Sequence, residues 1–368
     1  MDFQTVLIKP ASGLCNMRCE YCFYCDEMEK RLKPSYGIMT EDTLKNIMGK
    51  ILKQASRHIC VGFQGGEPTL AGTEFFEKVL YYEEMLNCNK AEIVNTIQTN
   101  GLNINDSWCE LLKKGKFLVG ISLDGIECVH DMYRHDRNGN PTFSKIVESI
   151  KLFEEYEIEY NILTVVTEDT VKYIDEIYDF YKENNIYFQQ YIACLDPLEE
   201  ERNKKRYSLS AETYGIFLDR LFKRWYSDWK KGDAPFIRQF ENIVGMLLGR
   251  CPESCEQRGT CSIQCIIEAD GSVYPCDFYA IDRYCLGNLN TDSLDKIFSN
   301  KVTEEFLRES GDINKNCKEC KYYNLCRGGC RRNRDSNNLN YFCKSYKYFF
   351  DNCVDDLCKV AWYIKNYF

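Results

Sequence analysis

Four cysteines lie close together near the start of the chain, in the stretch CNMRCEYCFYC. Cys15, Cys19 and Cys22 have the spacing C-x3-C-x2-C and follow a short apolar run. Three thiolates on one loop can hold three irons of a 4Fe-4S cluster and leave the fourth iron open, whereas a structural zinc site takes a fourth protein ligand. The spacing therefore predicts chemistry on a small molecule at an open iron. The alternative is a zinc loop that uses Cys25 as its fourth ligand.

The overall composition is that of a globular protein that stays out of membranes. The chain is 44% hydrophobic and 28% charged, and it has no run of about 18 apolar residues. Its start, MDFQTVLIKP, lacks the basic and apolar regions of a secretory signal, so we expect a cytoplasmic protein. In that reducing compartment, 22 cysteines indicate metal binding or catalysis. A net charge of -9 argues against nucleic-acid binding.

Short β-branched runs alternate with longer amphipathic ones from residue 5 to about 230, which is typical of βα units around a parallel sheet. We therefore predict an α/β fold, a partial (β/α)6 TIM-like barrel with a lateral opening that suits a large substrate. The expected strands are Thr5–Pro10, Ile59–Gln64, Ile93–Thr99, Phe117–Leu123, Tyr160–Val166 and Phe188–Leu195. The expected helices are Thr40–Ala55, Glu74–Leu86, Asp106–Lys113, Phe143–Tyr156, Val171–Glu183 and Ala211–Trp229.

The composition changes after Gly249, where many cysteines stand among Gly, Asn and charged residues. A small domain that buries little apolar surface needs metal or disulfide cross-links. The segment IIEADGSVYPC predicts a hairpin, because Asp270-Gly271 is a strong turn signal. We therefore expect a barrel over residues 1–235, a cysteine-rich domain over 236–345 and a C-terminal helix over 346–368 that packs on the barrel.

The cysteine loop, with Tyr21 beside its last ligand, resembles that of the radical S-adenosylmethionine (SAM) enzymes, in which SAM occupies the open iron. The turn GGEP follows a predicted strand, and its two glycines let the backbone come close to a ligand. Alone it could be any strand-to-helix turn. With the loop, the resemblance implies a cofactor-binding set of Tyr21, Gly65, Gly66, Glu67, Ser122, Arg134 and Leu195. Ser122 and Arg134 have alternative readings as a barrel hydroxyl and a surface salt bridge.

Two cysteine blocks in the C-terminal region resemble the SPASM extension of radical SAM peptide-modifying enzymes. Cys261, Gly271 and Cys276 are spaced C-x9-G-x4-C, and the second block, C-x2-C-x5-C-x3-C, precedes Cys343. The resemblance implies two auxiliary 4Fe-4S clusters, and so three clusters in all. One alternative is that the second block binds zinc. Another is that Cys251 replaces Cys255 as a ligand of the first auxiliary cluster. The implied ligands are Cys255, Cys261, Cys276 and Cys330 for the first cluster and Cys317, Cys320, Cys326 and Cys343 for the second.

Further segments narrow the resemblance to the anaerobic sulfatase-maturating enzymes, over residues 5 to 350. These segments are YGIMT, FQGGEPTLAG, IQTNG, FLVGISLDG, CLDPL and DGSVYPCDFY. The resemblance implies oxidation of the Cys or Ser in a sulfatase motif Cys/Ser-x-Pro-x-Arg to Cα-formylglycine. A 5'-deoxyadenosyl radical would take a β-hydrogen, Asp277 would accept a proton, and the auxiliary clusters would accept an electron. The alternative is a ribosomal-peptide maturase that forms thioether or carbon-carbon cross-links; an iron-sulfur electron carrier would not need GGEP.

The remaining expectations concern peptide contacts and partners. Tyr24 and Gln64 are candidates for contacting the peptide, or else they pack against the cluster. The alternative to proton acceptance by Asp277 is that it only hydrogen-bonds a loop near the cluster. We expect an unfolded sulfatase polypeptide as substrate, reduced flavodoxin or a ferredoxin-type protein as electron donor, and a monomer. The sequence leaves open which sulfatase is the substrate and whether Cys or Ser is preferred.

Overall fold

The computed structural model describes residues 5–367, and its chain divides into two compact units. Unit 1 comprises the residues up to Ser122, Tyr133–Asn161 and Ile263–Phe306, and unit 2 comprises Leu123–Met132, Ile162–Ser262 and Leu307–Phe368. Each unit therefore joins early and late parts of the chain. Three of the five divisions fall inside an element, namely α5 (Glu127–Tyr133), β5 (Tyr160–Val166) and α12 (Lys301–Ser310).

Unit 1 is built on a sheet whose strands follow the order β10-β9-β8-β1-β2-β3-β4. Strands β1 to β4 are parallel, with Val6 opposite Val61, and β1 also pairs in parallel with β8. Strands β8 and β9 form the predicted antiparallel hairpin. The bounds are β1 Thr5–Ile8, β2 His58–Phe63, β3 Glu92–Thr99, β4 Leu118–Ser122, β8 Ile266–Ile267, β9 Ser272–Tyr274 and β10 Gly287–Asn288.

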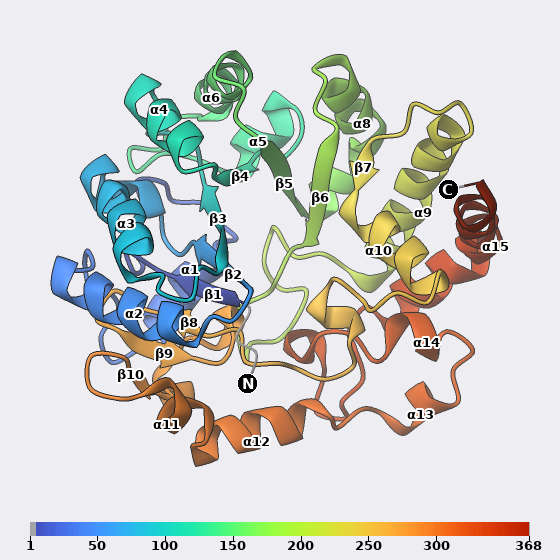
Figure 1. The fold of residues 1–368 in the computed structure, drawn as a ribbon. Helices are drawn as coiled ribbons and strands as arrows, with labels where there is room; N and C mark the ends of the chain where they lie inside the picture. The colour runs from blue at the N-terminus through green and yellow to red at the C-terminus, as the bar shows by residue number, and fades with distance from the viewer. Residues whose placement is uncertain (1–4, 368) are drawn as a thin grey trace. The chain divides into compact units, whose positions relative to one another are not determined.

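Helices α2, α3 and α4 follow one another along the outer side of β1 to β4 (Figure 1). Helix α2 begins where the Thr40 side chain accepts a hydrogen bond from Thr43 N at 3.3 Å, and it buries Leu44, Ile47 and Ile51 on one face. The helices of unit 1 are α1 Phe23–Glu29, α2 Glu41–Gln54, α3 Thr73–Leu86, α4 Asp106–Lys114, α6 Phe143–Glu155 and α11 Leu294–Phe298. Short 3-10 turns occupy Pro68–Ala71, Asp277–Tyr279 and Asp282–Tyr284.

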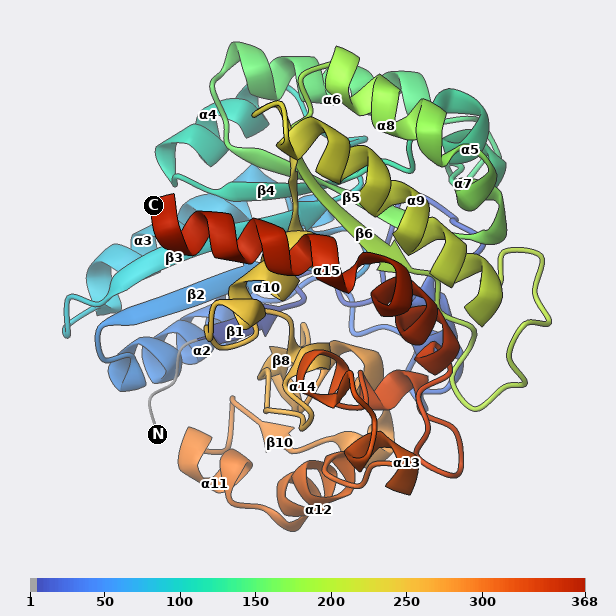
Figure 2. The same ribbon diagram turned by 90° about the vertical axis from the view of Figure 1, so that its right-hand side faces the viewer.

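Unit 2 holds most of β5, β6 (Phe188–Ala193) and β7 (Phe236–Ile237), paired in parallel. Helices α9 and α15 lie side by side in it (Figure 2). The ring of Phe222 on α9 lies 5.8 Å from that of Phe349 on α15. The helices are α7 Glu168–Lys172, α8 Ile174–Glu183, α9 Ala211–Trp229, α10 Arg238–Leu247, α13 Lys315–Lys318, α14 Tyr323–Cys326 and α15 Cys343–Tyr367, with 3-10 turns at Cys255–Gln257 and Arg331–Asn333.

All six expected strands and the hairpin are confirmed, with ends that shift by no more than two residues. The expected helix Val171–Glu183 is two helices, because the chain leaves helical geometry at Tyr173. Helices α1, α5, α10 and α12 were not expected, and neither was the β1–β8 pairing. Residues 1 and 368, at the ends of the expected domains, lie outside the described residues.

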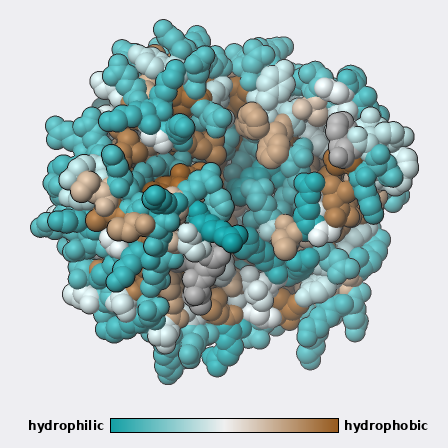
Figure 3. Space-filling view, in the orientation of Figure 1, coloured by the Kyte–Doolittle hydropathy of each residue, from teal (hydrophilic) through white to brown (hydrophobic). Residues whose placement is uncertain are grey.

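The surface seen in Figure 3 is mainly hydrophilic, with small apolar areas scattered over it. Within residues 5–367, no helix is both long enough and apolar enough to cross a membrane.

Candidate functional site

The four N-terminal cysteines lie on the loop after β1 and on the first turn of α1. Met17 N donates a hydrogen bond to Cys15 Sγ at 3.3 Å. Burial raises the pKa of the Cys15 thiol to about 12, and the charges of Glu67, Cys19 and Cys22 add to this effect. The three cysteines of the C-x3-C-x2-C motif are therefore close neighbours.

The loop is fixed by hydrogen bonds to the last residue of α5 and to the segment that follows it. Arg18 N donates to His135 O at 2.9 Å, and Glu20 N donates to Tyr133 O at 3.0 Å. The Arg137 guanidinium donates to Cys15 O at 2.6 Å. This part of the chain therefore holds the cysteine backbone in one shape.

The donor set fits a 4Fe-4S cluster with one open iron. All three motif cysteines are free thiols, and soft thiolates are the ligands that such clusters take. Cys25 is near as well, since a hydrogen bond from Cys22 to Cys25 raises the pKa of Cys22, with burial as a second cause. Cys25 is thus a neighbour of the motif.

The GGEP turn lies directly against the cysteine loop. Gly65 and Gly66 have φ angles of 94° and 52°, which glycine adopts without strain. A Cβ on Gly66 would lie 2.1 Å from Leu14 O, and Glu67 N donates to that same oxygen at 2.7 Å. Glycine is therefore required at position 66 by both conformation and space.

Glu67 is buried and its carboxylate is fully used within the protein. Oε1 accepts from Thr69 N at 3.0 Å, Thr69 Oγ1 at 2.7 Å and Thr99 Oγ1 at 2.7 Å, and Oε2 accepts from Asn100 N at 2.7 Å. Burial raises its pKa, although these hydrogen bonds lower it. The side chain therefore ties the GGEP turn to the end of β3.

Asn100 was not singled out from the sequence, although it belongs to the segment IQTNG. Its Nδ2 lies 3.6 Å from Cys15 Sγ and donates to Asn16 Oδ1 at 2.7 Å. The position of IQTNG at the end of a predicted strand was the available signal.

Three other residues of the expected SAM set are placed as follows. Arg134 donates to Tyr21 Oη at 3.0 Å and is only 6% exposed, so it is not a surface salt bridge. Ser122, at the end of β4, accepts a hydrogen bond from Gln98 at 3.1 Å. Leu195 belongs to unit 2, is half-buried and follows β6.

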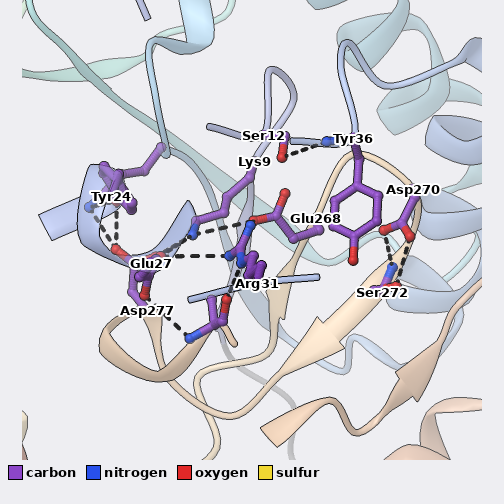
Figure 4. Close-up of polar contacts among 12 residues, drawn as sticks. Lys9, Ser12, Tyr24, Glu27, Arg31, Tyr36, Glu268, Asp270, Ser272 and Asp277 are labelled. Carbon is purple, nitrogen blue, oxygen red and sulfur yellow. Dashed lines mark hydrogen bonds and ion pairs between the residues drawn. The ribbon is translucent and has the colours of Figure 1, made fainter. Parts of the chain in front are cut away.

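Asp277 has Tyr24 and Lys9 beside its carboxylate (Figure 4), and Gln64 is a third neighbour. Tyr24 Oη donates to Oδ2 at 2.6 Å, and Gln64 Nε2 donates to Oδ2 at 3.1 Å and to Tyr24 Oη at 2.7 Å. Lys9 Nζ lies 3.2 Å from Oδ1. The structure thus brings together the three residues that were expected to act on the peptide, Tyr24, Gln64 and Asp277.

A buried ion cluster adjoins Asp277 and was missed from the sequence. Lys9 Nζ lies 3.3 Å from Glu27 Oε2 and 3.5 Å from Glu268 Oε1, and Arg31 Nη1 lies 2.8 Å from Glu268 Oε1. Burial raises the pKa of Glu27 to about 7, against the opposing charges of Lys9 and Arg31. Burial lowers the pKa of Lys9, but the three carboxylates outweigh it and the net shift is upward. No spacing in the sequence signals this cluster.

Seven of the eight expected auxiliary ligands belong to unit 2, and Cys276 belongs to unit 1. Burial is the main cause that raises the pKa of Cys330 to about 12, and the charges of nearby Cys255 and Cys261 contribute to the same shift. Burial also raises the pKa of Cys326 to about 12, with added contributions from Cys343 and Cys317. Cys317 in turn has Cys320 as a neighbour. Cys330 thus has Cys255 and Cys261 in its surroundings, and Cys326 has Cys343 and Cys317.

Two family models match the chain. The radical SAM superfamily matches residues 10–181, and the SPASM iron-sulfur cluster-binding domain matches residues 255–321. The cysteine-type anaerobic sulfatase-maturating enzyme of Clostridium perfringens is 43% identical, over 98% of this chain and 99% of that protein. The serine-type enzyme of Bacteroides thetaiotaomicron is 27% identical, over 94% of this chain and 88% of that protein.

A solved structure, native anSMEcpe with bound AdoMet and Cp18Cys peptide, superposes with a TM-score of 0.93. The identity is 44%, over 98% of this chain and 99% of that one. The α/β fold with a parallel sheet and a cysteine-rich C-terminal region is therefore confirmed.

Proposed function

We propose that this chain, which belongs to the anaerobic sulfatase-maturating enzymes, oxidises a residue of a sulfatase polypeptide to Cα-formylglycine. The observation that carries the proposal is the 43% identity over nearly the whole of both chains. The target is a cysteine in the motif Cys-x-Pro-x-Arg, because the identity to the serine-type enzyme is only 27%. Serine is the second substrate to test.

The cofactors follow from the cysteine sets. The proposed ligands are Cys15, Cys19 and Cys22 for the cluster with the open iron, Cys255, Cys261, Cys276 and Cys330 for the first auxiliary 4Fe-4S cluster, and Cys317, Cys320, Cys326 and Cys343 for the second. Cys255 is favoured over Cys251 because it lies near Cys330. The proposed SAM contacts are the GGEP turn, Tyr21, Ser122, Arg134 and Leu195. The proposed domains are a SAM barrel over residues 1–235, a SPASM domain over 236–345 and a terminal helix over 346–368, whereas α15 begins three residues before that bound, at Cys343.

Asp277 is the proton acceptor in the reaction. When bound, the open cluster and SAM would supply a 5'-deoxyadenosyl radical that removes a hydrogen atom from the substrate β-carbon, and the auxiliary clusters would accept the electron that leaves afterwards. The cysteine thiol must lose its proton for the carbon-sulfur double bond to form. The Asp277 carboxylate takes that proton, and the resulting thioaldehyde reacts with water to give the aldehyde and hydrogen sulfide.

Tyr24 and Gln64 place the peptide next to that carboxylate. Both donate hydrogen bonds to the same oxygen, Oδ2, at 2.6 and 3.1 Å. Their polar groups surround the proton acceptor, where the target side chain has to enter. Their role is to hold the Asp277 carboxylate and the incoming side chain in one arrangement.

The partners follow from the same chemistry. The substrate is an unfolded sulfatase segment, because the target side chain must reach a buried carboxylate. The electron donor is a reduced flavodoxin or ferredoxin-type protein, and the enzyme acts as a monomer in the cytoplasm. Support for a reducing compartment comes from the cysteines, all of which are free thiols.

The test is mass spectrometry of a Cys-x-Pro-x-Arg peptide after anaerobic incubation with reduced enzyme and SAM. We expect loss of sulfur and formation of an aldehyde. A product that has lost two hydrogens and kept its sulfur would instead identify a cross-linking peptide maturase. The matched serine peptide measures the preference between the two target residues.

A further inference from the structure

Lys9 is a buried charged residue that the proposed chemistry does not use. It directly follows β1, and its side chain is 1% exposed. Lysine is almost never fully buried unless it is paired. Here its ammonium faces three carboxylates and lies 4.6 Å from the centre of the Tyr24 ring. A lysine in this setting has a defined position and a small choice of partners.

The two oxygens of Asp277 are held in different ways. Oδ2 accepts from the neutral donors Tyr24 and Gln64. Oδ1 has no hydrogen-bond partner among residues 5–367 and faces Lys9 Nζ at 3.2 Å. Contacts to Oδ2 alone would let the carboxylate pivot about that oxygen. The ammonium of Lys9 supplies the second point that fixes its plane.

Lys9 is itself fixed from several directions. Glu27 and Glu268 hold its ammonium, and Arg31 pairs with both of these carboxylates, at 3.6 and 2.8 Å. Its stem packs against the GGEP turn, because a Cβ on Gly65 would lie 2.5 to 2.9 Å from the Lys9 side-chain carbons. The lysine therefore runs beneath the expected SAM turn and ends at the expected proton acceptor.

We propose that Lys9 is a positioning residue for Asp277, holding its carboxylate at the orientation in which it receives the substrate proton. Glu27, Glu268 and Arg31 keep the lysine in place. This inference rests on the proposed role of Asp277. A misplacement of about 1 Å in a reacting group can cost about 100-fold in rate, so the loss of one of two anchoring points has a measurable consequence.

The main test compares the wild type with Lys9→Met and with the double variant Lys9→Met/Glu27→Gln, each with its clusters loaded. The double variant removes one cation and one carboxylate, so the buried cluster keeps its net charge. The peptide assay measures formylglycine formed and 5'-deoxyadenosine released. We expect deoxyadenosine release to continue in both variants, while aldehyde per deoxyadenosine falls about 10-fold or more.

Asp277→Asn provides the second arm. If Lys9 acts through Asp277, adding Lys9→Met/Glu27→Gln to Asp277→Asn should lower the aldehyde yield little further, because both changes remove the same step. If the two losses multiply, the proposal is wrong. Normal aldehyde yield in the double variant would also overturn it, and so would loss of iron from that variant, since Lys9 would then serve the fold.

The controls separate this proposal from the function on which it rests. A wild-type enzyme that forms no aldehyde would refute the formylglycine assignment. An Asp277→Asn variant with normal yield and full iron would refute Asp277 as proton acceptor. The Lys9 variants bear on the present inference when wild type is active and Asp277→Asn is impaired.

Discussion

Glu83 on α3 gives a prediction whose size follows from its surroundings. Asn95 Nδ2 donates to Glu83 Oε2 at 3.0 Å, while Glu83 Oε1 and Asn95 Oδ1 are buried with no hydrogen-bond partner in the described part of the chain. Burial raises the pKa of Glu83 from 4.5 to about 7, and the bond from Asn95 opposes this only in part. The ionised carboxyl is thus costly in the folded protein.

The sign of the effect on stability follows from the direction of that shift. The folded protein binds the Glu83 proton more tightly than the unfolded chain does. The stabilisation that this proton gives to the folded state is therefore complete below pH 4.5 and is lost as the pH rises through 7. At about 1.36 kcal/mol for each pKa unit, the free energy of unfolding that is lost over this pH range amounts to about 3 kcal/mol. Glu83→Gln cannot ionise, and its amide can donate to Asn95 Oδ1.

We therefore expect Glu83→Gln and the wild type to have nearly the same free energy of unfolding near pH 4.5. At pH 8 we expect the variant to be more stable by up to about 3 kcal/mol. The assay is the thermal unfolding midpoint of both proteins between pH 4.5 and 8.5, in which this difference corresponds to several degrees. Glu27 titrates in the same range, but it is present in both proteins and cancels from the comparison.

Glu84→Gln is the matched control, because it removes one negative charge from the next, exposed position of α3. It should leave the pH dependence unchanged. A Glu83→Gln variant that is less stable than wild type at pH 8, or that shows the same pH dependence, would refute the reasoning.

Three further predictions concern the active centre. The reconstituted enzyme should hold about 12 irons, and a variant with alanine at all three C-x3-C-x2-C cysteines should keep about 8 and lose SAM cleavage; about 4 irons with bound zinc in the wild type would contradict two auxiliary clusters. Gly66→Ala should abolish SAM binding, measured by equilibrium dialysis, because its Cβ would lie 2.1 Å from a backbone oxygen of the cysteine loop. Asp277→Asn should lower aldehyde yield by about 100-fold or more while deoxyadenosine release continues.

The strands were predictable because their burial is set by local alternation. In β5, for example, the pattern YNILTVV places Ile162, Thr164 and Val166 on the buried face. The cysteine spacings and the GGEP glycines were equally readable, since each reflects a requirement within a few residues. One expected helix was wrong near its start, where Tyr173 separates α7 from α8.

The ion cluster was not predictable, because its members depend on contacts between distant parts of the chain. In the sequence, Lys9 stands at the end of an apolar run and Glu268 stands shortly before a turn, and neither position indicates a buried ion pair. Only the pairing of β1 with β8 brings them together. The role of Glu67 was hidden for the same reason, since its donors Thr99 and Asn100 come from the next strand.

The place of β1 between β2 and β8 has a consequence for the order of events during synthesis. At ~5–20 residues per second, the ribosome needs roughly 13–50 s after finishing β1 before β8 exists. During this interval one edge of β1 has no strand to pair with, and unpaired edges are templates for aggregation.

The buried cations near the start of the chain also depend on partners that are synthesised late. Among the described residues, Glu27 is the one carboxylate in the first part of the chain that pairs with Lys9 and Arg31, and Glu268 and Asp277 are synthesised much later. Two cations against one carboxylate favour a hydrated, open arrangement over a buried one. The segment from Lys9 to Arg31, which contains the cysteine loop, therefore stays hydrated until residues 268 and 277 supply the two missing carboxylates.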